Sequence, residues 1–146
     1  MVSEDLRAFV GDWELAVDLR GAEDVLGKVM FELMGEVLVQ RTALPIPQAP
    51  DSVCVIVGQT DGSYAQHYFD ARGVARLYRM TLDGHAWTLE RKKADFTPLD
   101  FHQRFLGTFA DDLTTIHGEW QSSGDGRAWD RDFGMTYRRA DETSQT

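Results

Sequence analysis

Apolar and polar residues alternate along most of the chain, a pattern typical of β-strands that bury one face. The clearest example is residues 63–91, where strand-like stretches are separated by tight turns. One predicted turn is Arg72-Gly73, since a residue–glycine pair supplies the positive φ angles that two-residue hairpin loops require. With that loop, His67 lies opposite Tyr78 and both share one face of the sheet.

A second turn at Asp83-Gly84 extends this face to the next strand. The face is richer in apolar groups than the opposite one, so it is predicted to point inward. It also carries charged and polar side chains that an ordinary core would not contain. The predicted inward residues are Ala65, His67, Phe69, Ala71, Val74, Arg76, Tyr78, Met80, Leu82, Trp87, Leu89 and Arg91.

Strand-like stretches at 28–34 and 37–43 are apolar on both faces, so their inward set stays open. The aromatic Phe31 favours one of the two choices. On that choice the inward residues are Val29, Phe31, Leu33, Leu38, Gln40 and Thr42.

At the C-terminal end, a loop at 111–112 places Phe105 opposite Gly118. A loop at 125–126 then places Trp120 opposite Arg131 and makes Arg131 and Tyr137 inward-facing. Gln103 lies on the inward side of the neighbouring strand under the same register.

In total, about ten short strands follow one another, mostly through hairpins. Consecutive hairpins favour an all-β fold, an up-and-down antiparallel β-barrel of about ten strands, because closure leaves no exposed sheet edge. A β-sandwich is the alternative. A short N-terminal helix between Ser3 and Gly11 precedes the barrel. Residues 1–139 are predicted to form one domain, and 140–146 a disordered polar tail.

Charge and composition narrow the class of protein. The formal net charge of −9 argues against a nucleic-acid partner, whose phosphates would be repelled. Cys54 is the single cysteine, which fits a reducing cytoplasm and a buried apolar role. We predict a cytoplasmic protein with no membrane partner, since the chain has neither a signal-peptide pattern nor an apolar run of membrane-spanning length.

The layout resembles the calycin superfamily. A Gly11-Asp12-Trp13 segment opens the first strand, and Tyr137-Arg138-Arg139 ends the last. That superfamily includes lipocalins, fatty-acid-binding proteins and ten-stranded nitrobindin-like barrels, and the closest resemblance is to bacterial nitrobindin-like or calycin-like proteins. The resemblance implies that Trp13 plugs one barrel end and that Arg139 covers it, an arrangement that cation–π attraction would stabilise.

The chain departs from the haem-binding members. Nitrobindin-like haem barrels open with Gly-x-Trp-x-Gly-x-Gly and place an axial histidine near the C-terminus. Here Glu14-Leu15-Ala16 follows the tryptophan, and no histidine follows His117. The sequence therefore predicts no cofactor or metal by that route, and haem or another porphyrin held through His67 is kept only as an alternative.

The predicted inward polar groups indicate the function. Several arginines inside a barrel are costly unless they are paired or solvated, so they favour a cavity for an anionic or amphipathic small molecule. The predicted ligand-binding residues are His67, Arg76, Tyr78, Arg91, Gln103, Arg131 and Tyr137. Binding without chemistry is the first hypothesis.

Two further expectations concern other roles for the same strands. A cyclase-, isomerase- or hydrolase-type enzyme using His67 and Tyr78 as an acid–base pair is the alternative function. A homodimer is expected through an outward apolar face carrying Val55, Val57, Tyr64 and Tyr68.

Overall fold

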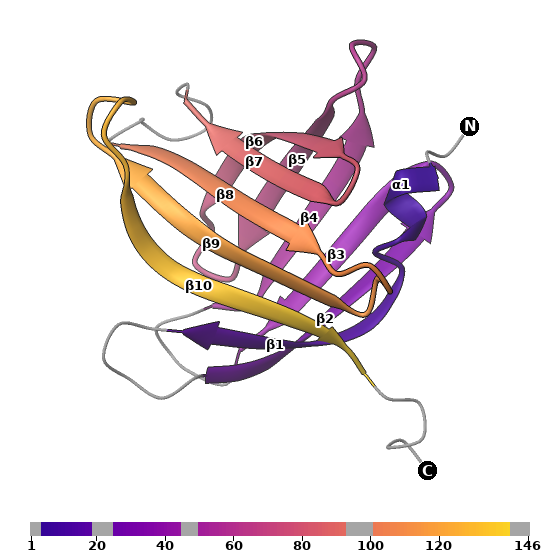
Figure 1. The fold of residues 1–146 in the computed structure, drawn as a ribbon. Coiled ribbons are helices and arrows are strands. Elements are labelled where there is room, and N and C mark those ends of the chain that lie inside the picture. Colours follow the sequence, from indigo (N-terminus) through magenta and orange to yellow (C-terminus); the bar gives the residue numbers. More distant parts are fainter. Residues whose placement is uncertain (1–3, 19–24, 45–49, 93–100, 141–146) are drawn as a thin grey trace.

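A computed structural model describes residues 4–18, 25–44, 50–92 and 101–140. These residues form a closed antiparallel barrel in which each strand pairs with its chain neighbours and β1 pairs with β10 (Figure 1). The predicted all-β barrel is thus confirmed. The elements are α1 (Glu4–Arg7), β1 (Gly11–Asp18), β2 (Val25–Met34), β3 (Val37–Ala43), β4 (Ser52–Gly58), β5 (Tyr64–Asp70), β6 (Ala75–Asp83), β7 (Ala86–Arg91), β8 (His102–Phe109), β9 (Thr115–Ser123) and β10 (Asp130–Arg139).

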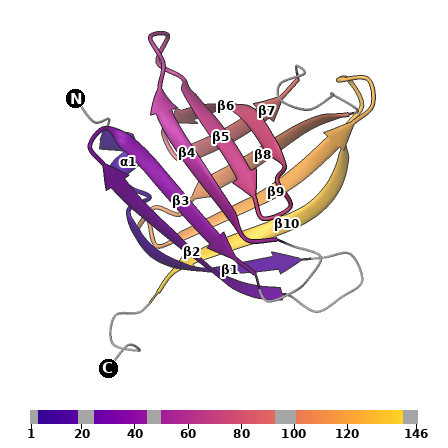
Figure 2. The ribbon, with the colours of Figure 1, turned by 180° about the vertical axis from the view of Figure 1, so that it is seen from behind.

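The barrel end nearest α1 is filled by aromatic side chains. Phe9 follows the single helical turn and is fully buried, with ring-centroid distances of 5.1 Å to Phe31, 4.9 Å to Trp87 and 5.1 Å to Phe109. In Figure 2, α1 lies beside the turn that joins β2 to β3. Two of these contacts are edge-to-face and the third is tilted, so the rings pack together at this end of the barrel.

The same end contains the contact that the calycin resemblance implies. Trp13 and Arg139 are register partners on β1 and β10, and the guanidinium carbon lies 4.3 Å from the indole ring centroid. The indole N–H donates to the Phe9 carbonyl at 2.7 Å. The indole ring of Trp13 is therefore buried, and its N–H has a hydrogen-bond acceptor.

The β2–β3 hairpin has the predicted register, with Met34 opposite Val37 across Gly35-Glu36. Phe31 and Leu38 are fully buried, which settles the inward set of these two strands in favour of the choice based on the aromatic residue.

The β5–β6 hairpin differs from the prediction, and the difference changes a whole strand. Asp70 and Val74 close a three-residue loop in which Gly73 has φ +85°. A type I turn followed by a left-handed glycine forms such loops. One extra loop residue moves every side chain of β5 to the other face. His67 consequently lies opposite Leu77, and Gln66 lies opposite Tyr78.

Two other predicted registers are also wrong, but in these strands the inward and outward faces are not exchanged. Met80 lies opposite Leu89 rather than Trp87, and Phe105 lies opposite Trp120 rather than Gly118. Both pairings are shifted by two residues. Because faces repeat every two residues, the inward sets of these strands are unchanged.

The predicted inward position of Arg131 is wrong because β10 contains a β-bulge. The register of β10 against β9 changes between Arg131 and Phe133, so Arg131 pairs with Gln121 on the outer face. Its guanidinium bonds Asp18 there at 2.9 Å. Beyond the bulge, Phe133 and Tyr137 point inward as predicted, with Tyr137 buried.

The predicted dimer face also changes. Tyr64 is buried and Tyr68 lines the interior, whereas Phe69 (45 % exposed) is on the outer surface beside Val53. Tyr64 and Tyr68 therefore do not belong to the predicted dimer face, and a homodimer itself stays a prediction. The predicted tail, 140–146, lies outside the described residues except for Ala140. No helix among the described residues is long and apolar enough to cross a membrane.

Candidate functional site

The barrel encloses a cavity of about 380 Å³ on the side away from α1. Such a volume lies within the range typical of small-molecule sites. Its apolar wall includes Trp87, Phe105, Trp120, Phe133, Met135 and Tyr137. Its polar wall includes Gln40, Gln66, Tyr68, Arg76, Tyr78 and Gln103.

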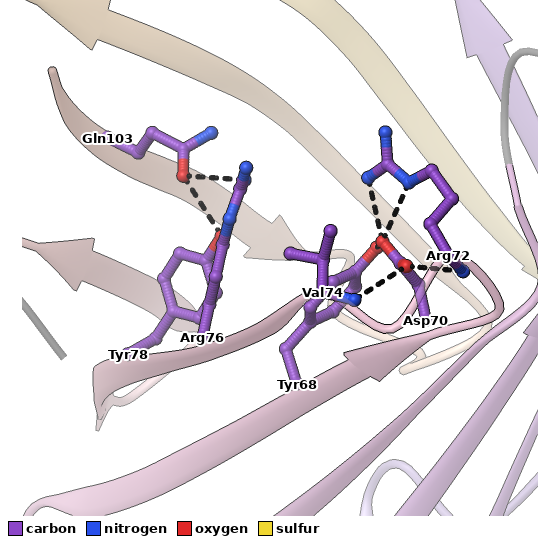
Figure 3. Close-up of polar contacts among 7 residues, drawn as sticks. All are labelled: Tyr68, Asp70, Arg72, Val74, Arg76, Tyr78 and Gln103. Atoms are coloured by element: carbon purple, nitrogen blue, oxygen red, sulfur yellow. Dashed lines mark hydrogen bonds and ion pairs between the residues drawn. The ribbon is translucent and has the colours of Figure 1, made fainter. Parts of the chain in front are cut away.

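Two arginines, Arg72 and Arg76, are the charged residues among the described residues that line this cavity, and Arg76 is the one without a carboxylate partner. It lies on β6, and its Nη1 donates to Oε1 of Gln103 at 3.3 Å. The Tyr78 hydroxyl donates to the same oxygen at 3.0 Å (Figure 3). The Gln103 amide, reaching in from β8, thus orients the guanidinium and the phenol without neutralising the positive charge.

Arg76 has no carboxylate partner among the described residues. Its Nε is buried and has no hydrogen-bond partner. Arg76 is partly exposed, and a charge that loses part of its water without gaining a counter-charge costs free energy. An anionic group entering the cavity would offset part of this cost.

Asp70, the acidic residue of β5, already has partners within the protein. Its Oδ2 accepts from Arg72 Nη2 at 2.7 Å and from the Tyr68 hydroxyl at 2.9 Å. Its Oδ1 accepts from the backbone N–H groups of Arg72 and Val74 at 2.9 and 3.3 Å. The hydrogen bond from Arg72 is the main cause that lowers the pKa of Asp70 to about 2. Figure 3 shows this cluster separate from the Arg76 cluster.

The remaining titratable groups of the cavity stay neutral at neutral pH. Burial raises the pKa of the Cys54 thiol to about 12, so it is not a thiolate nucleophile. Burial also raises the pKa values of the Tyr78 and Tyr137 hydroxyls. Hydrogen bonds from Arg76 oppose the shift at Tyr78 without cancelling it. Both phenols are hydrogen-bond donors rather than bases.

Unpartnered polar atoms gather at the cavity. Among the described residues, four buried side-chain atoms lack a hydrogen-bond partner. Three of them, Gln66 Oε1, Arg76 Nε and Trp87 Nε1, belong to residues that line this cavity. Buried polar groups in native proteins are nearly always partnered by protein or ordered water, so these three atoms need partners that the described residues do not supply.

The structure brings together four of the seven predicted site residues. Arg76, Tyr78, Gln103 and Tyr137 line the cavity. Arg91 is 3 % exposed and lies opposite Gln103 on β7, outside the cavity wall.

For two of the predicted site residues, the predicted inward position is wrong. Arg131 is outside the barrel because of the bulge in β10. His67 faces outward because of the three-residue β5–β6 loop, so it cannot form an acid–base pair with Tyr78. None of the four histidines of the chain lines the cavity, and the residues present do not fit haem held through His67.

Gln66, Tyr68 and Arg72 are the cavity residues that the sequence interpretation missed. They follow from the correct loop length. Asp70 at the first position of a type I turn and Gly73 at the fourth is the sequence signal for that loop, since aspartate and glycine favour these two positions. Reading Asp-x-x-Gly instead of Arg-Gly would have found all three.

Comparison with known proteins supports the fold. No family model matches this chain, and no curated protein matches it significantly. Among solved structures, the crystal structure of Rv2717c from M. tuberculosis is similar, with a TM-score of 0.62 and 12 % sequence identity. The match covers 97 % of this chain and 100 % of that one. The similarity is one of fold, and a barrel of this kind is consistent with the calycin resemblance.

Proposed function

We propose that this protein binds a small hydrophobic or amphipathic carboxylate inside the barrel and performs no chemistry on it. The single observation that carries the proposal is Arg76, a cation that projects into an aromatic-walled cavity without a carboxylate partner among the described residues. The calycin-like layout of the sequence agrees with a carrier or binding role.

The two walls suit the two parts of an amphipathic acid. Guanidinium offers a fork of N–H donors that matches the two oxygens of a carboxylate. The Tyr78 hydroxyl and the Gln103 amide adjoin it and could share the charge. Beyond them, Phe105 and Trp120, with a centroid distance of 5.4 Å, form an apolar surface for a hydrocarbon chain.

Calorimetric titration with decanoate tests the proposal. The Arg76→Met variant should bind decanoate roughly 30-fold more weakly, because a charge-assisted hydrogen bond contributes about 2 kcal/mol. Arg79→Met is the matched control, since Arg79 lies on the same strand, faces outward and pairs with Asp61 at 3.7 Å. Its affinity should equal that of the unmodified protein.

Two observations would contradict the proposal: equal affinity in Arg76→Met and the unmodified protein, or decanol binding as tightly as decanoate. Native mass spectrometry of freshly purified protein adds an independent test. A reproducible extra mass that disappears on denaturation would support a resident ligand and report its chemical class.

A further inference from the structure

Two of the unpartnered atoms in the cavity are of opposite kind and belong to residues on neighbouring strands. Arg76 Nε is a donor, and Gln66 Oε1 is an acceptor on a side chain only 3 % exposed. Gln66 lies opposite Tyr78, and Arg76 is two residues before Tyr78 on β6. The two residues are therefore diagonal neighbours on one face of an antiparallel strand pair, and such neighbours lie about 7–8 Å apart across the two strands.

The other cavity glutamines have partners within the protein. The Gln40 amide nitrogen donates to Thr42 Oγ1 at 3.4 Å, and the Gln103 oxygen accepts from Arg76 and Tyr78. Gln66 thus differs from two residues of the same type in the same cavity. Leaving a buried acceptor unpaired costs about 1–3 kcal/mol, so a donor supplied by a ligand would be rewarded there.

A simple carboxylate cannot satisfy both atoms. When ionised it offers only acceptors, which suit Arg76 and leave the Gln66 oxygen unpaired. We propose that the cavity selects acids that carry a hydrogen-bond donor beside the carboxylate, namely 2-hydroxy acids or N-acyl amino acids with a hydrophobic chain. This inference rests on the proposed function and adds the ligand class to it. The carboxylate binds Arg76, and the adjacent O–H or N–H donates to Gln66.

The test uses three probes of equal chain length: decanoate, 2-hydroxydecanoate and 2-oxodecanoate. The 2-hydroxy acid has the donor, whereas the 2-oxo acid places an acceptor at the same position. In calorimetric titrations of the unmodified protein, 2-hydroxydecanoate should bind about tenfold more tightly than the other two. This comparison needs no variant, so it is independent of any folding defect.

The Gln66→Met variant should lose the tenfold preference and bind the three probes alike. Gln59→Met is the matched control, since Gln59 is exposed and does not line the cavity. It should keep the preference. Far-UV circular dichroism of both variants checks that the barrel is intact.

The outcomes separate this inference from the proposed function. If the three acids bind equally and all depend on Arg76, the donor preference is overturned, while carboxylate binding stands; a water molecule then serves Gln66. If none of the acids binds, or binding does not depend on Arg76, the proposed function itself fails. If Gln59→Met loses the preference as well, Gln66 is not the selecting group and the inference is overturned.

Discussion

Asp70 shows how one side chain can shape both a loop and a cavity wall. Its carboxylate binds two backbone N–H groups of the β5–β6 loop, the Arg72 guanidinium and the Tyr68 hydroxyl. By holding Arg72 and Tyr68, it leaves Arg76 as the cation available to a ligand. The lowered pKa of Asp70, about 2, reports these same contacts.

We predict that Asp70 makes stability depend on pH in the acid range. A carboxyl whose pKa falls from about 3.8 unfolded to about 2 folded contributes stability that is complete above about pH 5 and is lost as the pH falls toward 2. The unscreened linkage is about 2.5 kcal/mol, and solvent screening at the barrel rim reduces it to about 1 kcal/mol. Between pH 6 and pH 2, urea unfolding should show a loss that is about 1 kcal/mol smaller in Asp70→Asn than in the unmodified protein. The loss that remains comes from other carboxyls with lowered pKa, among them Asp61, Asp112 and Asp125.

Arg72→Met supplies a second check on the same pH dependence. Because Arg72 is the main cause of the lowered pKa, its removal should flatten the curve in the same direction as Asp70→Asn. Parallel curves for all three proteins would show that the Asp70 cluster does not contribute.

At the scale of elements, what matters is whether the predicted register of a hairpin is wrong by an odd or an even number of residues. An even error keeps the inward face of a strand, and an odd error exchanges the two faces. The β6–β7 and β8–β9 registers were wrong by two residues, and Tyr78 and Gln103 still face inward. The β5–β6 register was wrong by one, and it replaced Gln66 by His67 as the predicted cavity residue. Alternation predicts faces within a strand. Only the loop geometry, which depends on Asp70 and Gly73, relates one strand to the next.

The bulge in β10 defines the other limit of sequence prediction. The inward positions of Phe133 and Tyr137 follow from alternation, and the outward position of Arg131 does not. Its ion pairs with Asp18 and Glu119, at 2.9 and 3.4 Å, join residues that are distant in the sequence. A local pattern cannot report such a tertiary preference.

The β8–β9 pair makes a testable packing unit. Gly107 and Gly118 are register partners, and the buried Phe105 ring covers both. A Cβ at Gly118 would lie 2.5 Å from Phe105 Cε1 and 3.2 Å from the Leu106 carbonyl oxygen. We therefore expect Gly118→Ala to lower the free energy of unfolding by about 2 kcal/mol through overpacking.

Gly58→Ala is the matched control for this substitution. Gly58 is also a strand residue, and a Cβ there would have open space around it. Urea denaturation should show a change within about 1 kcal/mol for this variant. Adding Phe105→Leu to Gly118→Ala should recover part of the loss, and strictly additive effects would contradict direct crowding.

The whole molecule has two unlike ends. At one end lie α1 (Figures 1 and 2) and the aromatic contacts of Phe9. The other end contains the cavity and the Asp70 loop. The packed end can stabilise the fold, while the end with the cavity contains polar side-chain atoms that lack partners among the described residues. At the end near α1, Arg139 makes several of the contacts that hold β10 against the N-terminal segment.

Arg139 links three parts of the chain across the β1–β10 seam. Its guanidinium stacks on Trp13 and donates to the carbonyls of Ala8, Val10 (2.8 Å) and Leu113 (3.2 Å). Arg139→Met should keep some apolar cover over the indole while losing these donors. Counting about 1–2 kcal/mol for the cation–π contact and about 1 kcal/mol for each net hydrogen bond, and allowing for relaxation, we expect a loss of about 3 kcal/mol in urea unfolding.

The neighbouring Arg138→Met variant isolates that effect. Arg138 is exposed on the outer face opposite Glu14, so its removal should change the free energy of unfolding by no more than about 0.5 kcal/mol. Equal losses in the two variants would mean that charge alone, rather than closure of the barrel end, accounts for the result. Because Arg139 and the cavity lie at opposite ends, Arg139→Met should also leave the decanoate affinity of the folded protein unchanged. A large affinity loss there would show instead that the closed end controls the shape of the cavity.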